Sequence, residues 1–211
     1  MGEGRSKWRT SKDVRHEGPS GALIGPNAIL QLLPQIERLG GEARVAQMLA
    51  EARVFEVPDG SRMIPEGDAA RLHQLLRRKE PMLAPELAAR AGRGTAEYIL
   101  GHRIPTPVQA VLKVLPAPLA ARLLSKAIAK HAWTFAGSGA FRVVSPWCFE
   151  IAHNPIVRGE RSGIPLCHWH VAVFARLYQV LVHPQAICVE NTCCAVHAQS
   201  QCRFELTVGT H

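Results

Sequence analysis

The chain has 211 residues, of which 47% are hydrophobic, so it is long enough and apolar enough to bury a core of its own. Charged residues make up only 20% of the sequence, and no long low-complexity run occurs, which excludes a wholly disordered chain. No apolar stretch reaches the ~18 to 20 residues that a membrane span needs, and no secretory signal pattern opens the chain. We therefore expect a cytoplasmic protein without a transmembrane segment.

The net charge of +8 is concentrated in the middle of the chain. Residues 71–130 hold eleven Arg or Lys and three Glu, so the rest of the sequence is neutral overall. A basic helical region could contact nucleic acid, anionic lipid or an acidic ligand, or could be a solvated face without a partner. Because no helix-turn-helix or ATPase motif follows Val208, we expect no nucleic-acid partner. A peripheral membrane contact through the basic helices stays open.

Residues 1–20 are rich in Gly, Ser and charged side chains and predict a flexible arm. The apolar residues from Ile29 to Ile36 have helical spacing, with Pro34 as an interruption, and Gly40 and Gly41 end that element before a second short helix to Ala52. Residues 57–65 predict a loop.

Four further helices are predicted at residues 66–79, 83–102, 107–115 and 118–133, because apolar positions recur with helical spacing between prolines. Residues 21–133 thus form a predicted helical region.

After residue 133 the pattern changes to strands. Residues 141–144 and 147–152 predict two strands joined through Ser145 and Pro146, and residues 187–191 and 202–208 alternate apolar with polar side chains. A helix over residues 165–182 separates the two pairs. We expect an α+β fold in which the helical region packs on an antiparallel sheet within residues 134–211.

Cysteines and a glutamate gather at the ends of these predicted elements. Six cysteines in a cytoplasmic chain are expected to be reduced, and Zn²⁺ prefers four tetrahedral ligands rich in thiolate. Cys167, Glu190, Cys193 and Cys202 could supply them, with Cys194 or His197 as competitors for a position. Buried apolar cysteines without a metal are the other interpretation, and the spacing alone leaves both open.

The segments Pro-Leu-Cys-His-Trp-His at 165–170, Val-Glu-Asn-Thr-Cys at 189–193 and Cys-Arg-Phe-Glu at 202–205 resemble the vinyl-reductase domain family. Segments near residues 24–34, 102–105, 131–139 and 154–160 are similar more narrowly to the 4-vinyl reductases of bacteriochlorophyll biosynthesis. The similarity runs from about Gly25 to Val208. It implies a small-molecule-binding fold with structural zinc on Cys167, Glu190, Cys193 and Cys202. The residues between the last two cysteines, Ala195 to Ala198, depart from the family's usual glycine.

The activity that this resemblance implies is reduction of the 8-vinyl group of a divinyl chlorophyllide-type precursor. A reductase would need NADPH or an external electron donor, yet no Gly-x-Gly-x-x-Gly follows a predicted strand, and the segment from Gly92 to Gly94 is too short to count. We therefore expect binding of a magnesium tetrapyrrole, with the chain as a carrier or accessory factor as an alternative to a stand-alone reductase.

Candidate pigment-binding residues lie around the junction of the two regions. Large aromatic side chains could pack on the macrocycle, a histidine could ligate magnesium, and an arginine could pair with the propionate. The candidates are Trp133, Phe135, Phe141, Trp147 and Trp169; His131, His168 and His170; and Arg103, Arg158 and Arg161. Plain core packing is the alternative for the aromatic residues.

Two other functions stay open on the sequence: a zinc-stabilised small-molecule sensor, and a subunit of a larger assembly. A homodimer and contacts with other enzymes of the pathway are further expectations that the sequence does not decide.

Overall fold

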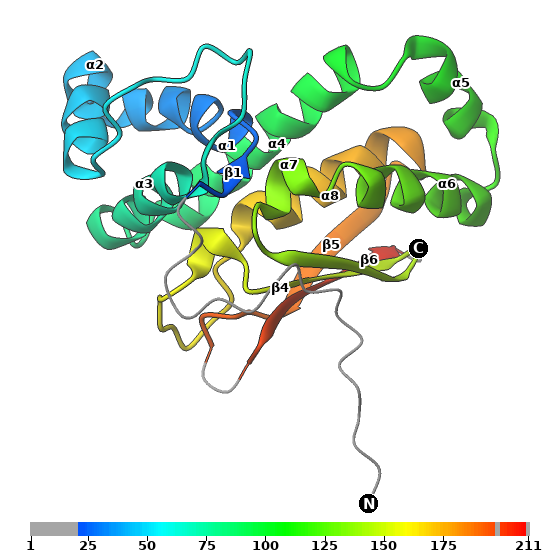
Figure 1. Cartoon of the computed structure of the whole chain (residues 1–211). Helices are drawn as coiled ribbons and strands as arrows, with labels where there is room; N and C mark the ends of the chain where they lie inside the picture. The colour runs from blue at the N-terminus through cyan, green and yellow to red at the C-terminus, as the bar shows by residue number, and fades with distance from the viewer. Residues whose placement is uncertain (1–20, 197–198, 210–211) are drawn as a thin grey trace, which may run out of the picture.

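The computed structural model describes residues 21–196 and 199–209 of the chain. A layer of helices lies on one side of an antiparallel sheet, and the strands form the opposite end of the molecule (Figure 1). The flexible arm predicted over residues 1–20 lies outside the described residues.

The helical part contains the predicted helices, with bounds close to those expected. They are α1 (Asn27–Leu30), α2 (Leu33–Glu51), α3 (Glu66–Lys79), α4 (Ala84–His102), α5 (Thr106–Val114), α6 (Ala117–Lys130) and α7 (Trp133–Ala136). A proline is the second residue of α2, α4, α5 and α6. The first turn of a helix leaves its N–H groups unpaired, so a residue without an N–H fits there. The prolines of α4, α5 and α6 mark helix starts as predicted, and Pro34, predicted as an interruption, lies at the start of α2.

The glycine pair in the first helical segment breaks α2 internally. Gly40 is extended, and Gly41 has φ 69° with ψ −166°, a conformation that side chains with a Cβ rarely adopt. The two short helices predicted around this pair are therefore present as one span with a non-helical break.

A two-stranded ladder, which the sequence does not reveal, closes the first part of the chain. β1 (Leu23–Ile24) pairs antiparallel with β2 (Ile64–Pro65), at the end of the segment predicted to be a loop. Two residues are too few to show an alternating pattern, so only the folded chain identifies these strands.

The main sheet has four strands and is antiparallel throughout, as predicted. β3 (Ala140–Ser145), β4 (Cys148–Ala152), β5 (Ala186–Thr192) and β6 (Gln201–Val208) lie in the order β3-β4-β6-β5. A short 3₁₀ turn, η1 (Pro155–Val157), and α8 (His168–Leu181) connect the two halves of the sheet.

The core lies between the inner face of the sheet and α8, and α4 packs on the other side of α8 (Figure 1). Close approach of these two helices depends on Gly92 of α4. A Cβ at this position would lie 2.3 Å from the backbone oxygen of Trp169 and 2.8 Å from the Cβ of Ala172, well inside van der Waals contact. Gly92 thus has a packing role.

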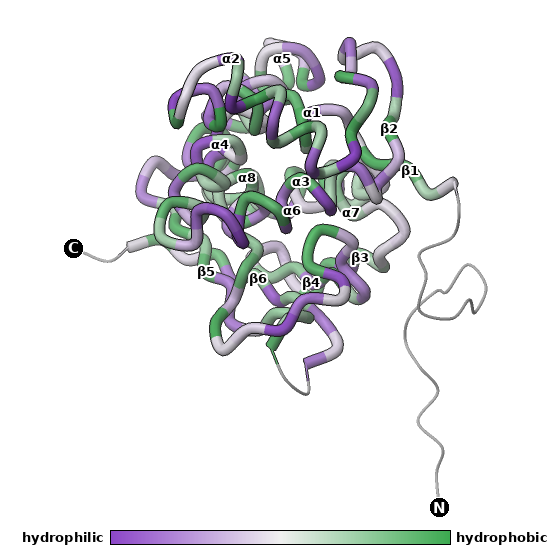
Figure 2. Tube along the Cα trace, turned by 90° about the vertical axis from the view of Figure 1, so that its left-hand side faces the viewer, coloured by the Kyte–Doolittle hydropathy of each residue, from purple (hydrophilic) through white to green (hydrophobic). Residues whose placement is uncertain are grey.

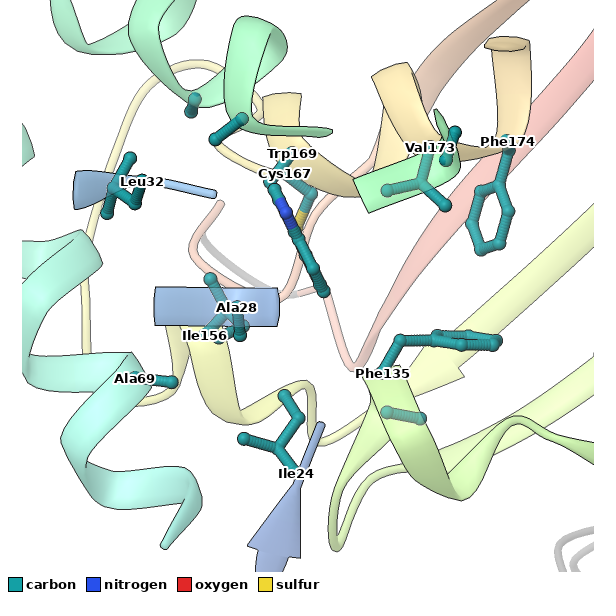
Figure 3. Close-up of a cluster of buried hydrophobic side chains, with 14 of the residues drawn as sticks. Ile24, Ala28, Leu32, Ala69, Phe135, Ile156, Cys167, Trp169, Val173 and Phe174 are labelled. Atoms are coloured by element: carbon teal, nitrogen blue, oxygen red, sulfur yellow. The ribbon is translucent and has the colours of Figure 1, made fainter. Parts of the chain in front are cut away.

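One continuous hydrophobic cluster joins the helices to the sheet. It includes Ile24 and Leu32 from the start of the chain, Phe135 and Phe174 near the sheet, and Trp169 at the beginning of α8 (Figure 3). The division at residues 133 and 134 stays a prediction. No helix in the described ranges is long and apolar enough to cross a membrane.

Candidate functional site: a thiolate cluster and a buried histidine

The start of α8 positions the first residue of the predicted metal site. Cys167 occupies the N-cap of this helix, two residues after Pro165. Its backbone N–H is one of the unpaired donors at a helix N-terminus and donates to Oε2 of Glu190 at 2.7 Å. The helix end therefore holds the glutamate of β5 beside the cysteine.

The structure brings together the four side chains that the sequence predicts. Cys167, Glu190, Cys193 and Cys202 are all buried, and their ligand atoms lie within 4.8 Å of one another. They come from the start of α8, from β5, from the residue after β5 and from β6. Residues that are distant in sequence thus converge at one edge of the core.

The distances between the three sulfurs fit a single metal ion bound by all of them. The Cys167 sulfur lies 3.4 Å from that of Cys202 and 3.9 Å from that of Cys193, and the third pair is 3.9 Å apart. Tetrahedral Zn–S bonds of ~2.3 Å place two sulfurs about 3.8 Å apart, whereas a disulfide joins them at ~2.0 Å. All three cysteines are free thiols.

Two further observations favour a cation at this place. Oε1 of Glu190 is buried and has no hydrogen-bond partner among the described residues, so one carboxylate oxygen is available as a ligand. The side-chain amide of Asn154 donates to the sulfurs of Cys167 at 3.3 Å and Cys202 at 3.6 Å, as donors around metal-bound thiolates do. This donor set can hold a tetrahedral, thiophilic ion.

The electrostatics explain why these groups need a cation to be charged together. Burial raises the pKa of Glu190 to about 8 and raises the pKa of the Cys167 thiol well above its usual range. Hydrogen bonds from the thiols of Cys167 and Cys202 lower the pKa of Cys193, so one thiolate is favoured in the cluster. A divalent ion would compensate the remaining negative charge.

Cys194, next to Cys193 in the sequence, lies outside the four-residue group. The Cys194 sulfur lies 3.5 Å from that of Cys202, but it also approaches the backbone oxygens of Ile151 and Ser200. Of Cys193 and Cys194, only Cys193 belongs to the compact four-residue group. His197, the other predicted competitor, lies outside the described residues.

Several predicted pigment-binding residues lie in a closely packed aromatic cluster above the sheet. Phe135 meets Phe141 and Phe174 edge to face, with ring centroids 5.2 and 5.5 Å apart. His170 lies 6.3 Å from the centroid of Phe135 and 5.8 Å from that of Phe204. The structure therefore groups Phe135, Phe141 and His170, and their aromatic contacts contribute to the core.

His170 is uncharged within this cluster. Burial lowers its pKa to about 4, so the imidazole is neutral at physiological pH. Its Nε2 lies 3.2 Å from the carbonyl oxygen of Phe135, which can only accept, so Nε2 carries the proton. Nδ1 is then a bare lone pair, and it has no partner in the part of the chain that the structure describes.

The other predicted ligand residues are spread around this cluster. Trp169 is buried and donates from Nε1 to the hydroxyl of Thr95 at 3.1 Å, and Trp147 packs on Tyr178. His168 is half-buried, and burial lowers its pKa. His131 and Trp133 are exposed at the end of α6 and the start of α7.

The three candidate arginines occupy separate environments. Arg158 pairs with Glu66 at 3.0 Å and also donates to Ser138 and to the backbone of His153. Arg103 follows α4 and lies over the ring of Tyr98, with 5.8 Å to the centroid. Arg161 is exposed.

Sequence reasoning missed two residues that the structure places at these sites. Asn154 is fully buried beside the sulfurs. Its signals in the sequence are the turn-forming pair that it makes with Pro155 and its place in the segment 154–160, which carries part of the family resemblance. His73 is buried on α3 against Trp169, with Nε2 2.9 Å from the oxygen of Ala28. Its position four residues after Ala69, on the apolar face of α3, could have identified it.

Comparisons with solved structures identify the fold. An Fe(II) unliganded H-NOX protein mutant from K. algicida superposes with a TM-score of 0.57 and 9% sequence identity, covering 89% of this chain and 98% of that chain. An H-NOX structure from work on heme distortion in that family gives a TM-score of 0.54 and 8% identity, covering 89% and 96% of the two chains. The fold of this chain is therefore similar to that of H-NOX domains. No protein-family model matches the chain.

Comparisons with curated sequences identify the family. The bacteriochlorophyll synthase 23 kDa chain of Cereibacter sphaeroides is 52% identical over 185 residues, which are 87% of this chain and 89% of the relative. The protein of the same description from Rhodobacter capsulatus is 44% identical over 87% of this chain and 86% of its own length. These identities support the predicted link to bacteriochlorophyll biosynthesis, and the chain belongs to the family of bacteriochlorophyll synthase 23 kDa chains.

Proposed function

We propose that this chain binds a divinyl protochlorophyllide-type magnesium tetrapyrrole and takes part in 8-vinyl reduction as a carrier or accessory factor. The observation that carries the proposal is His170, a neutral buried imidazole whose Nδ1 lone pair has no partner among the described residues. Because His170 is only 1% exposed, the aromatic rings around it must move apart to admit the macrocycle. Magnesium in a tetrapyrrole takes an axial nitrogen ligand, and the macrocycle packs on aromatic side chains. The family of the chain supports the choice of pigment.

The fold similarity adds support from an independent direction. One of the similar H-NOX structures comes from work on heme distortion, and heme is also a metal tetrapyrrole. At 9% sequence identity this likeness shows the fold alone. The assignment of an axial ligand must therefore rest on the residues of this chain. His170 is the candidate axial ligand inside the core, and His131 beside the exposed Trp133 is the candidate at the surface.

The topology of the sheet supports the proposed role as carrier or accessory factor. Nicotinamide cofactors bind most often at βαβ units, where a glycine-rich turn joins a strand to a helix. The four-stranded sheet is antiparallel throughout, and Gly92, in the short segment from Gly92 to Gly94, packs closely on α8. We expect electrons to come from a partner enzyme of the pathway that contacts this chain.

The test is anaerobic titration of the purified chain with divinyl protochlorophyllide, followed by Soret and red absorption, with and without NADPH. A band shift without ethyl product is expected. NADPH-dependent ethyl product would replace the carrier role with a reductase, and no shift at all would overturn pigment binding.

Histidine variants refine this test. His170→Gln is expected to weaken the band shift about tenfold or more, whereas His131→Ala keeps it if the buried imidazole is the ligand. Far-UV circular dichroism and the thermal midpoint of each variant separate a lost ligand from a lost fold. A full band shift in His170→Gln together with a lost shift in His131→Ala would show that the pigment binds at the surface, with His131 as its ligand.

We also propose that Cys167, Glu190, Cys193 and Cys202 hold a structural zinc ion. With four protein ligands no coordination position stays open, so the ion would stabilise the fold and would not activate substrate. Cys193→Ser is expected to lose the metal, measured by plasma mass spectrometry of the purified chain, and Cys194→Ser is the matched control that keeps it. Retention of one zinc per chain by Cys193→Ser would contradict this ligand set.

One observation favours a second candidate function. The relatives are described as a chain of a synthase, which is the wording used for a subunit. As an assembly subunit, the chain would bind a pathway protein stably and give no band shift with pigment, so the titration above discriminates between the two functions.

A further inference from the structure

The segment that contains α5 and α6 has an unusual charge pattern. No Asp or Glu occurs between Glu97 and Glu150, whereas this segment contains Arg103, Lys113, Arg122, Lys126, Lys130 and Arg142. A long cationic stretch without acidic side chains produces a positive potential over its surface. α5 lies at the end of the molecule away from the sheet in both views (Figures 1 and 2).

Large apolar side chains are exposed on the same two helices. Val108, Val111 and Val114 of α5 are 47%, 54% and 82% exposed, and Leu119 and Leu123 of α6 are 48% and 49% exposed. Single exposed apolar residues are common on protein surfaces, but five on two consecutive helices form a group. Trp133, 55% exposed, is the first residue of α7, three residues after the end of α6.

The helical spacing places apolar and basic side chains on one face of α6. Leu119, Leu123, Lys126 and Lys130 follow one another at intervals of four, three and four residues, so they align along the helix. The opposite face of α6 is buried and contains Ala120, Ala121, Leu124, Ser125 and Ile128. The outer face is therefore amphipathic in its own right.

The cations of α5 and α6 form no ion pair within the part of the chain that the structure describes. Lys113, Arg122, Lys126 and Lys130 form no ion pair with any described residue, whereas Arg44, Arg77 and Arg176 on other helices each pair with a glutamate. Unpaired cations beside exposed aliphatic side chains are suited to a binding partner that has negative charge at its surface and an apolar layer beneath it.

We propose that the exposed apolar face of α5, with Val108, Val111 and Val114, and the outer face of α6, with Leu119, Leu123, Arg122, Lys126 and Lys130, dock together on an anionic lipid membrane. Valines and leucines would enter the acyl boundary, lysines and Arg122 would meet lipid phosphates, and Trp133 would sit at the headgroup level. A nucleic acid offers phosphates but no apolar layer for the aliphatic residues. A second copy of this surface would bring like charges together.

The experiment is flotation of the full-length, metal-loaded chain with vesicles of phosphatidylcholine alone or mixed with phosphatidylglycerol. Binding is expected to the mixed vesicles and to weaken with salt, because surface charges are screened. Lys126→Glu with Lys130→Glu is expected to weaken this binding at least roughly tenfold. Val111→Ser with Val114→Ser is expected to weaken it by a similar factor.

Matched controls change the same chemistry elsewhere. Arg38→Glu with Arg78→Glu makes the same charge change at exposed residues of α2 and α3, and Phe55→Ser with Met82→Ser removes exposed apolar groups outside the surface. These controls should bind like the unaltered chain. Equal loss in control and surface variants, or no preference for anionic vesicles, would overturn the proposal. A dimer in sedimentation that only the valine variant abolishes, without vesicle binding, would assign the surface to a second copy.

Discussion

The amide nitrogen of Asn154 lies 3.3 Å from the sulfur of Cys167, in the fully buried space between η1 and the start of α8. The same nitrogen approaches the sulfur of Cys202, so one side chain donates to two of the four candidate metal ligands. A hydrogen-bond donor at this position lowers the cost of a buried thiolate and orients both sulfurs.

Asn154→Ala is therefore expected to reduce zinc affinity about 10- to 100-fold, because outer hydrogen bonds commonly contribute this much to a metal site. Competition with a chromophoric chelator measures the affinity. Asn191→Ala, at an exposed residue of β5, is the control and should keep the affinity. Unchanged affinity in Asn154→Ala would show that the amide only fills space.

Gly92→Ala should destabilise the chain although alanine is the better helix former. The new Cβ would lie 2.3 Å from the Trp169 oxygen, and we expect a net loss of about 1 to 3 kcal/mol in the free energy of unfolding. Gly101→Ala in the same helix meets no atom within 4 Å and should be neutral or stabilising by up to about 1 kcal/mol. Denaturant unfolding measures both, and equal effects would contradict close packing of α4 on α8.

Burial lowers the pKa of His73 to about 3, against an ordinary value of 6.5. The unfolded chain therefore binds a proton at this residue below pH 6.5 that the folded chain excludes until about pH 3, so stability is full above pH 6.5 and falls as the pH drops. At pH 5 this amounts to about 2 kcal/mol.

His73→Gln can keep the hydrogen bond to the Ala28 oxygen and cannot titrate. The difference in unfolding free energy between pH 7 and pH 5 should shrink by about 2 kcal/mol in this variant. Comparison with the unaltered chain in the same buffers removes the contribution of the metal site. An identical pH dependence would mean that His73 is accessible to protons in the folded state.

Arg158 and Arg161 are both candidate partners of a propionate on the sequence, and the structure separates their expected effects. Glu66 is buried and loses its ion pair without Arg158 but keeps two hydrogen bonds from Ser138, so Arg158→Ala should cost about 1 to 2 kcal/mol of stability. Arg161→Ala, at an exposed position, should leave the thermal midpoint within about 1 °C of the unaltered chain. A lower midpoint in Arg161→Ala would show that its side chain has a structural partner.

The helix starts were predictable because proline acts locally, and the four-stranded sheet was predictable because alternation of apolar residues is local too. The cluster of Cys167, Glu190, Cys193 and Cys202 was identified through element ends and a family resemblance, and the structure gathers these residues. Packing relationships were not predictable in this way. Neither the contact of Gly92 with Trp169 nor the position of Asn154 between two sulfurs leaves a periodic signal, because each depends on elements far apart in the chain.

The order of strands has a consequence for how the chain matures during synthesis. Among the strands of the described residues β6 is made last, yet it lies between β4 and β5. Until it leaves the ribosome, two earlier strands keep open edges, and Cys202 is absent from the thiolate cluster. Insertion of one final strand thus closes the sheet and completes the four-residue cluster together, so a chain in which this cluster is assembled has also passed the step at which exposed strand edges invite aggregation.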